Sequence, residues 1–368
     1  MENSFFYGSA ELDKPVFRDL ANDMSLPYLV LAIKEIKNYK KNANKYFDYY
    51  KKGKHPKICK GIAKCLENLT LQEAKKVVRA IETLEKRKDI KNYITVNKIK
   101  IDTFTFNNKD LKLWAKKCVD KRINILQQEI IPLVPRVPLD KQGNPIPPNP
   151  TPNPNRFLNI YMKSLKAIDL TNWEPGSDEI SASFVNMDEN FSATQYGPFQ
   201  VGSYSRNGQI EPSTGPILIK SFPLNINYTL PKIFTCTASI AEVDCGGFAK
   251  FMEAVWAFVC GDLAVAIFNA LAQNSVLTAT AVVAGCSTAL AALLVIIAAC
   301  VIALVAVFII SAIIQALKDD VFDPFTFVEG LVSPGGMLSN GAMTKEVKNI
   351  YEKHGGKYEI TMILELIK

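Results

Sequence analysis

Carboxylates that gather near the ends of predicted strands are the side chains of this sequence most able to do chemistry. The group comprises Asp169, Asp178, Glu179 and Asp188. Loops at one end of a β-sandwich that carry several carboxylates can bind Ca²⁺ through oxygen ligands. Acidic residues are also common in turns and at strand edges, so the sequence predicts a calcium site only if these side chains converge. No other cofactor is expected.

Residues for enzyme catalysis are nearly missing from the sequence. The chain has two histidines, His55 in a lysine-rich loop and His354 before a Gly-Gly turn, and neither lies in a pattern that would pair it with a nucleophile. The eight cysteines show no Cys-x-x-Cys pair and no zinc-ligand spacing. No glycine-rich phosphate-binding motif occurs. We therefore expect no enzyme activity, and these patterns establish no metal site.

The most informative feature is a stretch of 55 residues without a charged side chain, here called the apolar segment (residues 263–317). In its inner part, residues 276–314, 20 of the 39 residues are Val, Leu, Ile or Phe. A run of about 18 apolar residues can cross the hydrocarbon of a bilayer. At roughly −0.3 to −0.6 kcal/mol per large aliphatic side chain, these residues contribute on the order of −10 kcal/mol to insertion.

Two hairpin geometries fit the apolar segment. In the first, Gly285 and Ser287 lie in the turn, and the arms 263–284 and 289–317 are each long enough to span a bilayer.

In the second geometry the turn is 273–275, and the arms are 248–272 and 276–317. The second of these arms is too long for one straight crossing, since a helix rises about 1.5 Å per residue. The first arm would contain Asp262, and an acid at mid-membrane costs about 2.5–3.5 kcal/mol. We therefore favour the first geometry for the inserted state.

The side chains predicted to enter the bilayer are large aliphatic residues along both arms: Leu263, Val276, Val283, Leu290, Leu294, Ile297, Val301, Val305, Ile309 and Ile313. The charged residues that flank the segment are expected to stay on one side of the membrane: Asp262, Lys318, Asp319 and Asp320. Two other interpretations stay open. The segment could be the buried core of a soluble domain, because a helix that is apolar all round suits a core as well as a membrane. It could also be sheltered in water and released at a bilayer.

The elements that would position this segment fall into two halves of opposite charge. Residues 1–158 hold 31 Lys and Arg against 17 Asp and Glu, and residues 159–368 hold 12 against 19. Residues 1–131 are predicted to form a basic, mainly helical domain. Its expected helices are Pro27–Tyr50, Thr70–Lys88 and Asn108–Ile131, and the alternation of Tyr93–Phe106 predicts a strand or hairpin between them.

A proline-rich linker over 132–156 separates the halves, since residues 132–154 contain nine prolines. After it, short alternating runs predict an antiparallel β-sandwich formed by 157–247 together with 321–368. The expected strands are Phe157–Leu170, Ile180–Met187, Ile217–Tyr228, Lys232–Val243 and Lys357–Ile367. The last strand is expected to return to the sheet built before the insert, so residues 248–320 form a hydrophobic helical hairpin inserted in an α+β protein.

One stretch of the second half has a familiar pattern. Asp169-Leu-Thr-Asn-Trp-Glu-Pro-Gly-Ser-Asp-Glu179, a strand, an apolar helical insert and then Asp319-Asp320-x-Phe322-x-Pro324 resemble bacterial β-sandwich modules of toxin- or effector-like proteins that carry a glycine-zipper-like insert. The resemblance covers about residues 157–368. This chain has Ala where a zipper has Gly, which still lets helices approach closely in lipid. The hidden apolar hairpin also resembles pore-forming colicins, without a shared motif.

These patterns lead to the hypothesis of a bacterial-type pore-forming toxin or effector that inserts into a membrane. The expected partners are a lipid bilayer, other copies of the chain, and a secretion or injection apparatus or an immunity protein. Nucleic acid is not expected, because no readout motif occurs. The first residues lack a signal peptide, so synthesis in the cytoplasm and export by a dedicated route are expected. The alternatives are a resident two-span membrane protein and a soluble binding module whose core is the segment.

Overall fold

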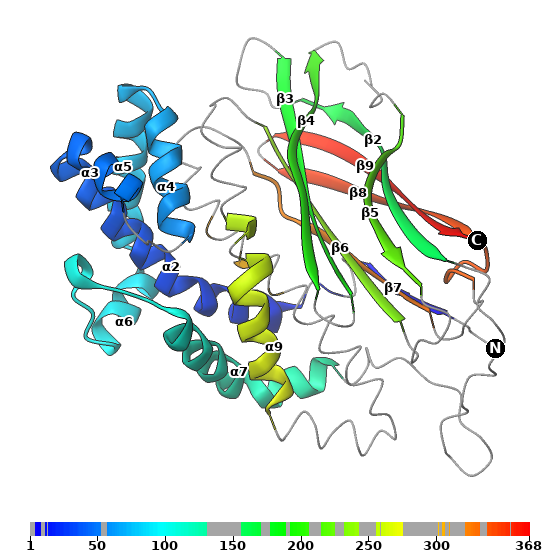
Figure 1. Ribbon diagram of the computed structural model, residues 1–368, viewed down its shortest axis with the longest axis horizontal. Coiled ribbons are helices and arrows are strands. Elements are labelled where there is room, and N and C mark those ends of the chain that lie inside the picture. The colour runs from blue at the N-terminus through cyan, green and yellow to red at the C-terminus, as the bar shows by residue number, and fades with distance from the viewer. Residues whose placement is uncertain are drawn as a thin grey trace.

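The computed structural model describes most of the helical and β regions of the chain. The described residues are 4–8, 12, 14–52, 57–130, 156–170, 177–188, 192–205, 215–224, 232–242, 255–257, 259–274, 301, 304, 305, 309, 321–331, 337–353 and 355–368. Figure 1 shows a group of helices on one side of the molecule and strands on the other.

The helical side is built around one long helix. Its elements are α2 (Pro15–Lys41), α3 (Ala43–Lys52), α4 (Lys57–Asn68), α5 (Leu71–Glu85), α6 (Lys88–Val96), the 3₁₀ turn η1 (Ile101–Thr103) and α7 (Asn108–Ile130). Most of the middle of α2 is buried, because α4, α5, α6 and α7 all pack against it. Pro15 stands in the first turn of α2, where the missing N–H of proline costs no hydrogen bond.

Two predictions for the helical region need correction. The first predicted helix already begins at Pro15 and breaks at Asn42, whose backbone is extended. The predicted strand Tyr93–Phe106 is wrong, since this stretch contains the end of α6 and the turn η1. The spacing of Ile90, Tyr93 and Ile94 is helical, and these side chains pack into the helical core.

The β side is an antiparallel arrangement of two sheets, which completes the α+β fold that the sequence predicts. The five-stranded sheet has the order β1 (Ser4–Tyr7), β7 (Phe325–Leu331), β6 (Lys232–Glu242), β3 (Ser177–Asp188), β4 (Ala193–Ser205). The four-stranded sheet has the order β5 (Ile217–Pro223), β2 (Phe157–Asp169), β9 (Gly356–Ile367), β8 (Thr344–Lys353). All neighbouring strands in both sheets run antiparallel.

The β topology confirms the predicted return of the chain after the insert. Strand β9 pairs with β2, and β7 pairs with β6. The sequence places residues 4–7 in the helical half, but they form β1 on the edge of the five-stranded sheet. The sequence does not predict strand β4, because Gly197, Pro198 and Gly202 interrupt its alternation. Its edge position tolerates proline.

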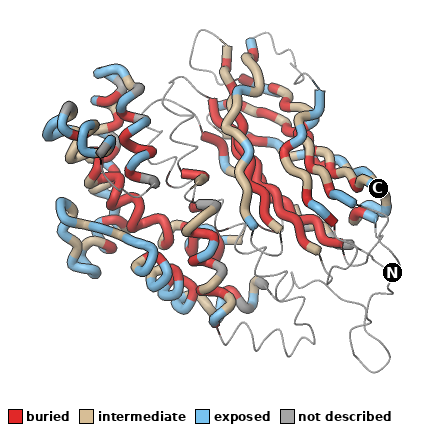
Figure 2. The backbone as a smooth tube through the Cα atoms, in the orientation of Figure 1, coloured by how far each residue is buried: buried red, intermediate tan, exposed pale blue. Residues whose placement is uncertain are grey.

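Strands β3, β6 and β7 of the five-stranded sheet are buried on both faces, which gives the molecule two cores. Phe184 and Phe327 point into the core between the sheets, whereas their neighbours Val185 and Val328 point into a second core shared with the helices. Successive residues of a strand face opposite sides, so β6 and β7 need apolar or small residues at nearly every position. Figure 2 shows these strands buried along their length.

Candidate functional site: the apolar segment

Four of the ten side chains predicted to enter a bilayer lie among the described residues: Leu263, Val301, Val305 and Ile309. The other predicted positions lie outside the described residues: Val276, Val283, Leu290, Leu294, Ile297, Ile313, the turn residues Gly285 and Ser287, and the flanking residues Lys318, Asp319 and Asp320. Asp262, the flanking acid at the other end of the apolar segment, is among the described residues.

The beginning of the apolar segment forms a helix in the second core. A π-helical turn, η3 (Val259–Leu263), leads into α9 (Ala264–Ala272). Alanine and large aliphatic residues favour a helix here, and no charged side chain interrupts it. Leu263, Ile267 and Leu271 are completely buried, whereas Val265 is 49% exposed. One side of α9 therefore reaches solvent, and its remaining sides are enclosed.

Residues from the far end of the apolar segment lie in the same core. Val301, Val305 and Ile309 recur every four residues, which places them on one face of a helix. All three side chains have no exposed surface. These predicted membrane-inserting residues face protein in this structure.

The helices and the five-stranded sheet enclose the described ends of the apolar segment from two sides. The shared core contains residues of α2 and α7, such as Phe17 and Val119, and residues of the sheet, such as Met187 and Ile233. Figure 1 shows α9 between the helices and the strands. Burial of such side chains contributes about 1.5–3 kcal/mol each. The enclosed state is therefore stabilised by the same apolar surface that favours a bilayer.

Helix α9 runs parallel to α7 and is joined to it by a polar contact near each end. The Asn108 amide Nδ2 donates to Oδ1 of Asp262 at 3.2 Å, and the Asn274 amide Nδ2 donates to Oδ1 of Asp120 at 2.9 Å. Both hydrogen bonds join residues 154 apart in the sequence, so the two contacts are about 18 Å apart along each helix. The described flank Asp262 is thus fixed on α7.

Helix α9 covers only the beginning of the arm 263–284 that the first geometry proposes for the inserted state. The backbone N–H groups of Gln273 and Asn274 bond back to Asn269 and Leu271 at 3.0 and 3.2 Å, and the helix stops at Ala272. Arm 263–284 is therefore not one continuous helix in this structure, and the break falls at the turn of the second geometry. Polar Gln273 and Asn274 explain the break, because asparagine is a weak helix former and here donates its side chain to α7.

Among the described residues, one helix is long and apolar enough to cross a bilayer, Val255–Ala272, which is 18 residues long. More than half of it is buried inside the protein. A core helix of a soluble protein passes the same test, so this helix alone does not distinguish the interpretations.

The carboxylates predicted to hold calcium do not converge. Asp178 and Asp188 lie at opposite ends of β3, about 33 Å apart at 3.3 Å per residue. Asp169 lies at the end of β2 in the other sheet, opposite Lys357. Asp178 is buried and accepts a hydrogen bond from the Tyr358 hydroxyl, and Glu179 accepts one from Ser177 at 2.9 Å. The described residues contain no group of three or more metal-binding side chains.

A buried acid in the helical core could not be recognised from the sequence. Glu35 on α2 is 3% exposed and accepts a hydrogen bond from the Tyr50 hydroxyl of α3. Burial raises the pKa of Glu35 to about 7, although nearby Lys34 and the Cys59 thiol act in the opposite direction. Burial also raises the pKa of Cys59. This group provides a titratable charge under α3 and α4.

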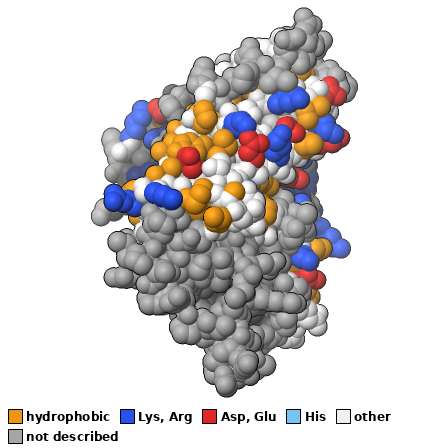
Figure 3. Space-filling model, turned by 90° about the vertical axis from the view of Figure 1, so that its right-hand side faces the viewer, with side chains coloured by type: hydrophobic (Ala, Val, Ile, Leu, Met, Phe, Trp, Pro, Cys, Tyr) orange, Lys and Arg blue, Asp and Glu red, His pale blue; other side chains and the backbone are white. Residues whose placement is uncertain are grey.

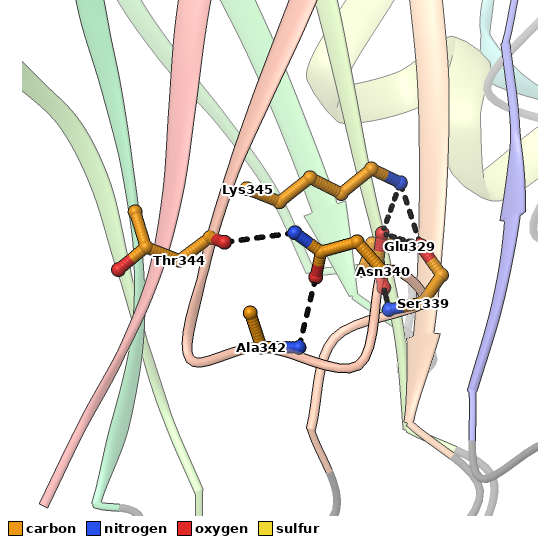
Figure 4. Close-up of polar contacts among 6 residues, drawn as sticks. All are labelled: Glu329, Ser339, Asn340, Ala342, Thr344 and Lys345. Carbon is orange, nitrogen blue, oxygen red and sulfur yellow. Dashed lines mark hydrogen bonds and ion pairs between the residues drawn. The ribbon is translucent and has the colours of Figure 1, made fainter.

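A second buried charge lies on β7, next to the edge strand β1 of the five-stranded sheet (Figure 4). The fully buried Glu329 carboxylate accepts from the Ser339 backbone N–H at 2.6 Å, the Ser339 hydroxyl at 3.0 Å and the Lys345 ammonium at 3.1 Å. The Lys345 Nζ also lies 3.2 Å from the ring centroid of Phe6 in β1. Burial raises the pKa of Glu329 and lowers that of Lys345, and their attraction opposes both shifts. The pair joins β7, β8 and the N-terminal strand.

Nothing in the described geometry brings a nucleophile, a base and an exposed cavity together, and the apolar segment is the feature that most needs a functional explanation. Comparison of the chain with protein-family models, with curated proteins and with solved structures finds no match.

Proposed function

We propose that this protein inserts the apolar segment into a lipid bilayer and permeabilises it, as a pore-forming toxin or effector. In water the segment is held in the core between the helices and the five-stranded sheet. At a membrane the helices move away from the sheet, and the segment exchanges its protein surroundings for lipid.

The observation that carries the proposal is that both described ends of a charge-free stretch of bilayer length are packed under amphipathic helices. The described ends of the segment, α9 and Val301 to Ile309, lie in the core shared with α2 and α7. The outer faces of helices α5 and α7 carry many charged side chains, which can stay in contact with water or lipid headgroups when the helices move. The proposed exchange of core for lipid leaves the aliphatic side chains buried in both states, so its main cost is lost packing and polar contacts.

The aliphatic residues supply the driving force for the exchange. In a bilayer the 20 large apolar residues of 276–314 favour insertion by on the order of 10 kcal/mol. The two polar contacts between α7 and α9 oppose release, each by about 0.5–1.5 kcal/mol. The balance allows a conditional segment, provided that a surface event loosens the helices.

The second candidate function is a soluble binding or structural module in which the segment is simply core. The complete burial of Val301, Val305 and Ile309 supports this interpretation as well. A charged residue at Val305 would unfold either kind of protein. The distinguishing substitution must lie in the segment yet reach solvent in the folded protein.

Val265→Asp meets this requirement because Val265 is 49% exposed within α9. We expect the variant to keep the wild-type unfolding temperature within a few degrees. A carboxylate in an inserted helix costs up to about 2.5–3.5 kcal/mol, so dye release from liposomes should fall at least tenfold.

Val96→Asp is the matched control, since Val96 is 73% exposed on α6 and lies outside the segment. It should release dye like the wild type. Equal dye release by the Val265→Asp variant and the wild type, or no release by the wild type from any vesicle, contradicts the proposal.

The third candidate function is a resident two-span membrane protein, and carbonate extraction of producing cells tests it. A resident two-span protein stays in the membrane fraction, whereas the proposed protein is soluble before it meets its target.

A further inference from the structure

Helix α7 has an outer face that is rich in lysine and carries an exposed large apolar residue. Lys109, Lys112, Lys116 and Lys117 are exposed, and Leu113 among them is 60% exposed. Steps of three and four residues place Lys109, Leu113 and Lys116 on one side of the helix. The opposite side, which includes Leu111, Ala115 and Val119, is buried in the core. We call the five exposed residues the α7 face: Lys109, Lys112, Leu113, Lys116 and Lys117.

The acidic residues of α7 do not neutralise this face. Asp110 accepts from the Asn107 N–H at 3.0 Å, and Glu129 pairs with Lys14 at 3.2 Å. Asp120 accepts from Lys116 at 2.6 Å and from Asn274 at 2.9 Å. Within the part of the chain that the structure describes, Lys109, Lys112 and Lys117 have no carboxylate partner, and Lys117 lies 5.4 Å from the Trp114 ring centroid.

The outer face of the four-stranded sheet shows the opposite pattern. There basic and acidic side chains pair across strands, as in Lys163–Glu346, Lys348–Glu359 and Lys357–Glu352. Figure 3 shows the side of the molecule on which this sheet lies, with both charge signs mixed among apolar side chains. A paired surface has little net field, whereas the α7 face keeps its positive charge.

We infer that the α7 face docks the protein on an anionic bilayer, with the lysines on lipid phosphates and Leu113 in the headgroup region. Unpaired lysines attract an anionic membrane by charge complementarity, and an exposed leucine between them suits the boundary between headgroups and acyl chains. Nucleic acid offers the same phosphates, but it gives an exposed leucine no apolar environment. The inference rests on the proposed function for its biological purpose, though not for the binding itself.

Docking through α7 would deliver the apolar segment to the membrane. Helix α9 is joined to α7 at Asp262 and Asn274 and packs directly beside it. Neighbouring helices are about 8–10 Å apart, so α9 would lie within one helix diameter of the lipid surface. Lys116 also shares Asp120 with Asn274. A lipid phosphate that attracts Lys116 would thus draw it away from Asp120, the residue that accepts the hydrogen bond from Asn274 at the end of α9.

The test is co-sedimentation of the full chain with vesicles of about 30% phosphatidylglycerol in phosphatidylcholine, which carry a negative surface potential, and with pure phosphatidylcholine. The test variant carries Lys109→Gln, Lys112→Gln, Lys116→Gln and Lys117→Gln. The control variant carries the same charge change on α5, α6 and the turn between them, with Lys75→Gln, Lys86→Gln, Lys88→Gln and Lys91→Gln, all exposed in the structure. Circular dichroism and thermal unfolding establish that both variants are folded.

Each lysine at an anionic surface is worth about a fivefold change in partitioning. We expect the α7 variant to bind the anionic vesicles at least a hundredfold more weakly than the wild type, and the control variant to lose much less. Binding should fall when the salt concentration rises, since a Debye length shrinks from about 10 Å at 0.1 M to about 3 Å at 1 M. Equal binding by the two variants, or equal wild-type binding to neutral vesicles, overturns the inference.

Dye release from the same samples separates this inference from the proposed function. Binding that depends on the α7 face without any dye release supports the inference and contradicts pore formation. Dye release that is equal for the α7 variant and the wild type supports pore formation and overturns the inference. Binding of a DNA duplex through the α7 face, with no binding to vesicles, also overturns it in favour of nucleic acid.

Discussion

Each half of the molecule contains a buried acid, Glu35 in the helical region and Glu329 in the β region. A separate stability prediction follows from each of them. Glu35 titrates under the helices α3 and α4, and Glu329 depends on Lys345 for its charge in the β region. Neither acid is exposed, so each substitution tests the structure before any membrane is added.

Glu35→Gln should make the protein more stable at high pH. The pKa of Glu35 is raised in the folded state to about 7 from an ordinary value near 4.5. Below about pH 4.5 the group is protonated in both states, and above about pH 7 its ionisation opposes folding, so the wild type loses stability as the pH rises between them. Urea unfolding at pH 8 should show a gain of about 2–3 kcal/mol for the variant, and a gain below about 1 kcal/mol at pH 5.

Glu67→Gln is the control for this titration, because its carboxylate lies near the surface beside Lys51. It should change stability by a similar small amount at both pH values. A Glu35→Gln variant whose gain does not depend on pH would show that Glu35 is not held as a buried acid.

Lys345→Met should destabilise the protein strongly, because it leaves the fully buried Glu329 without its cation. Removal of one partner of a buried pair costs about 3–5 kcal/mol. Lys348→Met is the matched change on β8 in an exposed pair with Glu359, and it should cost less than about 1 kcal/mol. Chemical unfolding of both variants measures the difference, and equal losses would contradict the role of the buried pair.

At the scale of elements, the proposed function requires the contact between the parallel helices α7 and α9 to break before insertion. The core joins the two helices along their length, and the Asn108–Asp262 and Asn274–Asp120 bonds fix their register. Release should therefore become easier when both bonds are removed.

The double variant Asn108→Ala, Asn274→Ala should release dye several times faster than the wild type. Its unfolding free energy should fall by about 1–3 kcal/mol, because two hydrogen bonds are lost. Asn124→Ala, an exposed change on α7, serves as the control and should alter neither quantity. A less stable double variant with unchanged or slower dye release would mean that separation of α7 from α9 does not limit insertion.

The sequence predicted those elements whose local pattern agrees with their final environment. Strands β2 and β9 alternate because only one face of the four-stranded sheet is buried, and α5 has a clear helical period. The strand prediction at Tyr93–Phe106 failed because the stretch alternates between apolar and polar residues, which is typical of a strand. The helical spacing of Ile90, Tyr93 and Ile94 decides the structure instead, since it lets α6 pack on the helical core. The two described ends of the apolar segment, α9 and Val301 to Ile309, are buried in the same core although they are far apart in the chain. Local sequence patterns carry no information on such contacts.

At the scale of the whole molecule, the five-stranded sheet separates two cores, and the proposed function requires only one of them to open. The core between the sheets is made by chain segments that pair in β-ladders, with β1 sealing one edge. The other core is made by helices, the described ends of the apolar segment and one sheet face. Under the proposed function, the second core opens while the strand pairing around the first stays intact, and we therefore expect the β region to stay folded when the segment enters a membrane.

The most direct test follows the apolar segment itself. A fluorophore that reports polarity is attached to the new thiol of a Val265→Cys variant. The wild type, whose described cysteines Cys59, Cys118 and Cys236 are buried, is treated with the same reagent and gives the background. A Val96→Cys variant with the same label is the control.

With anionic vesicles under conditions of dye release, the label at position 265 should shift to an apolar environment and be quenched by lipids brominated in their acyl chains. The label at position 96 should stay in water. If the vesicles leak while the label at position 265 remains in water, the apolar segment does not enter the bilayer.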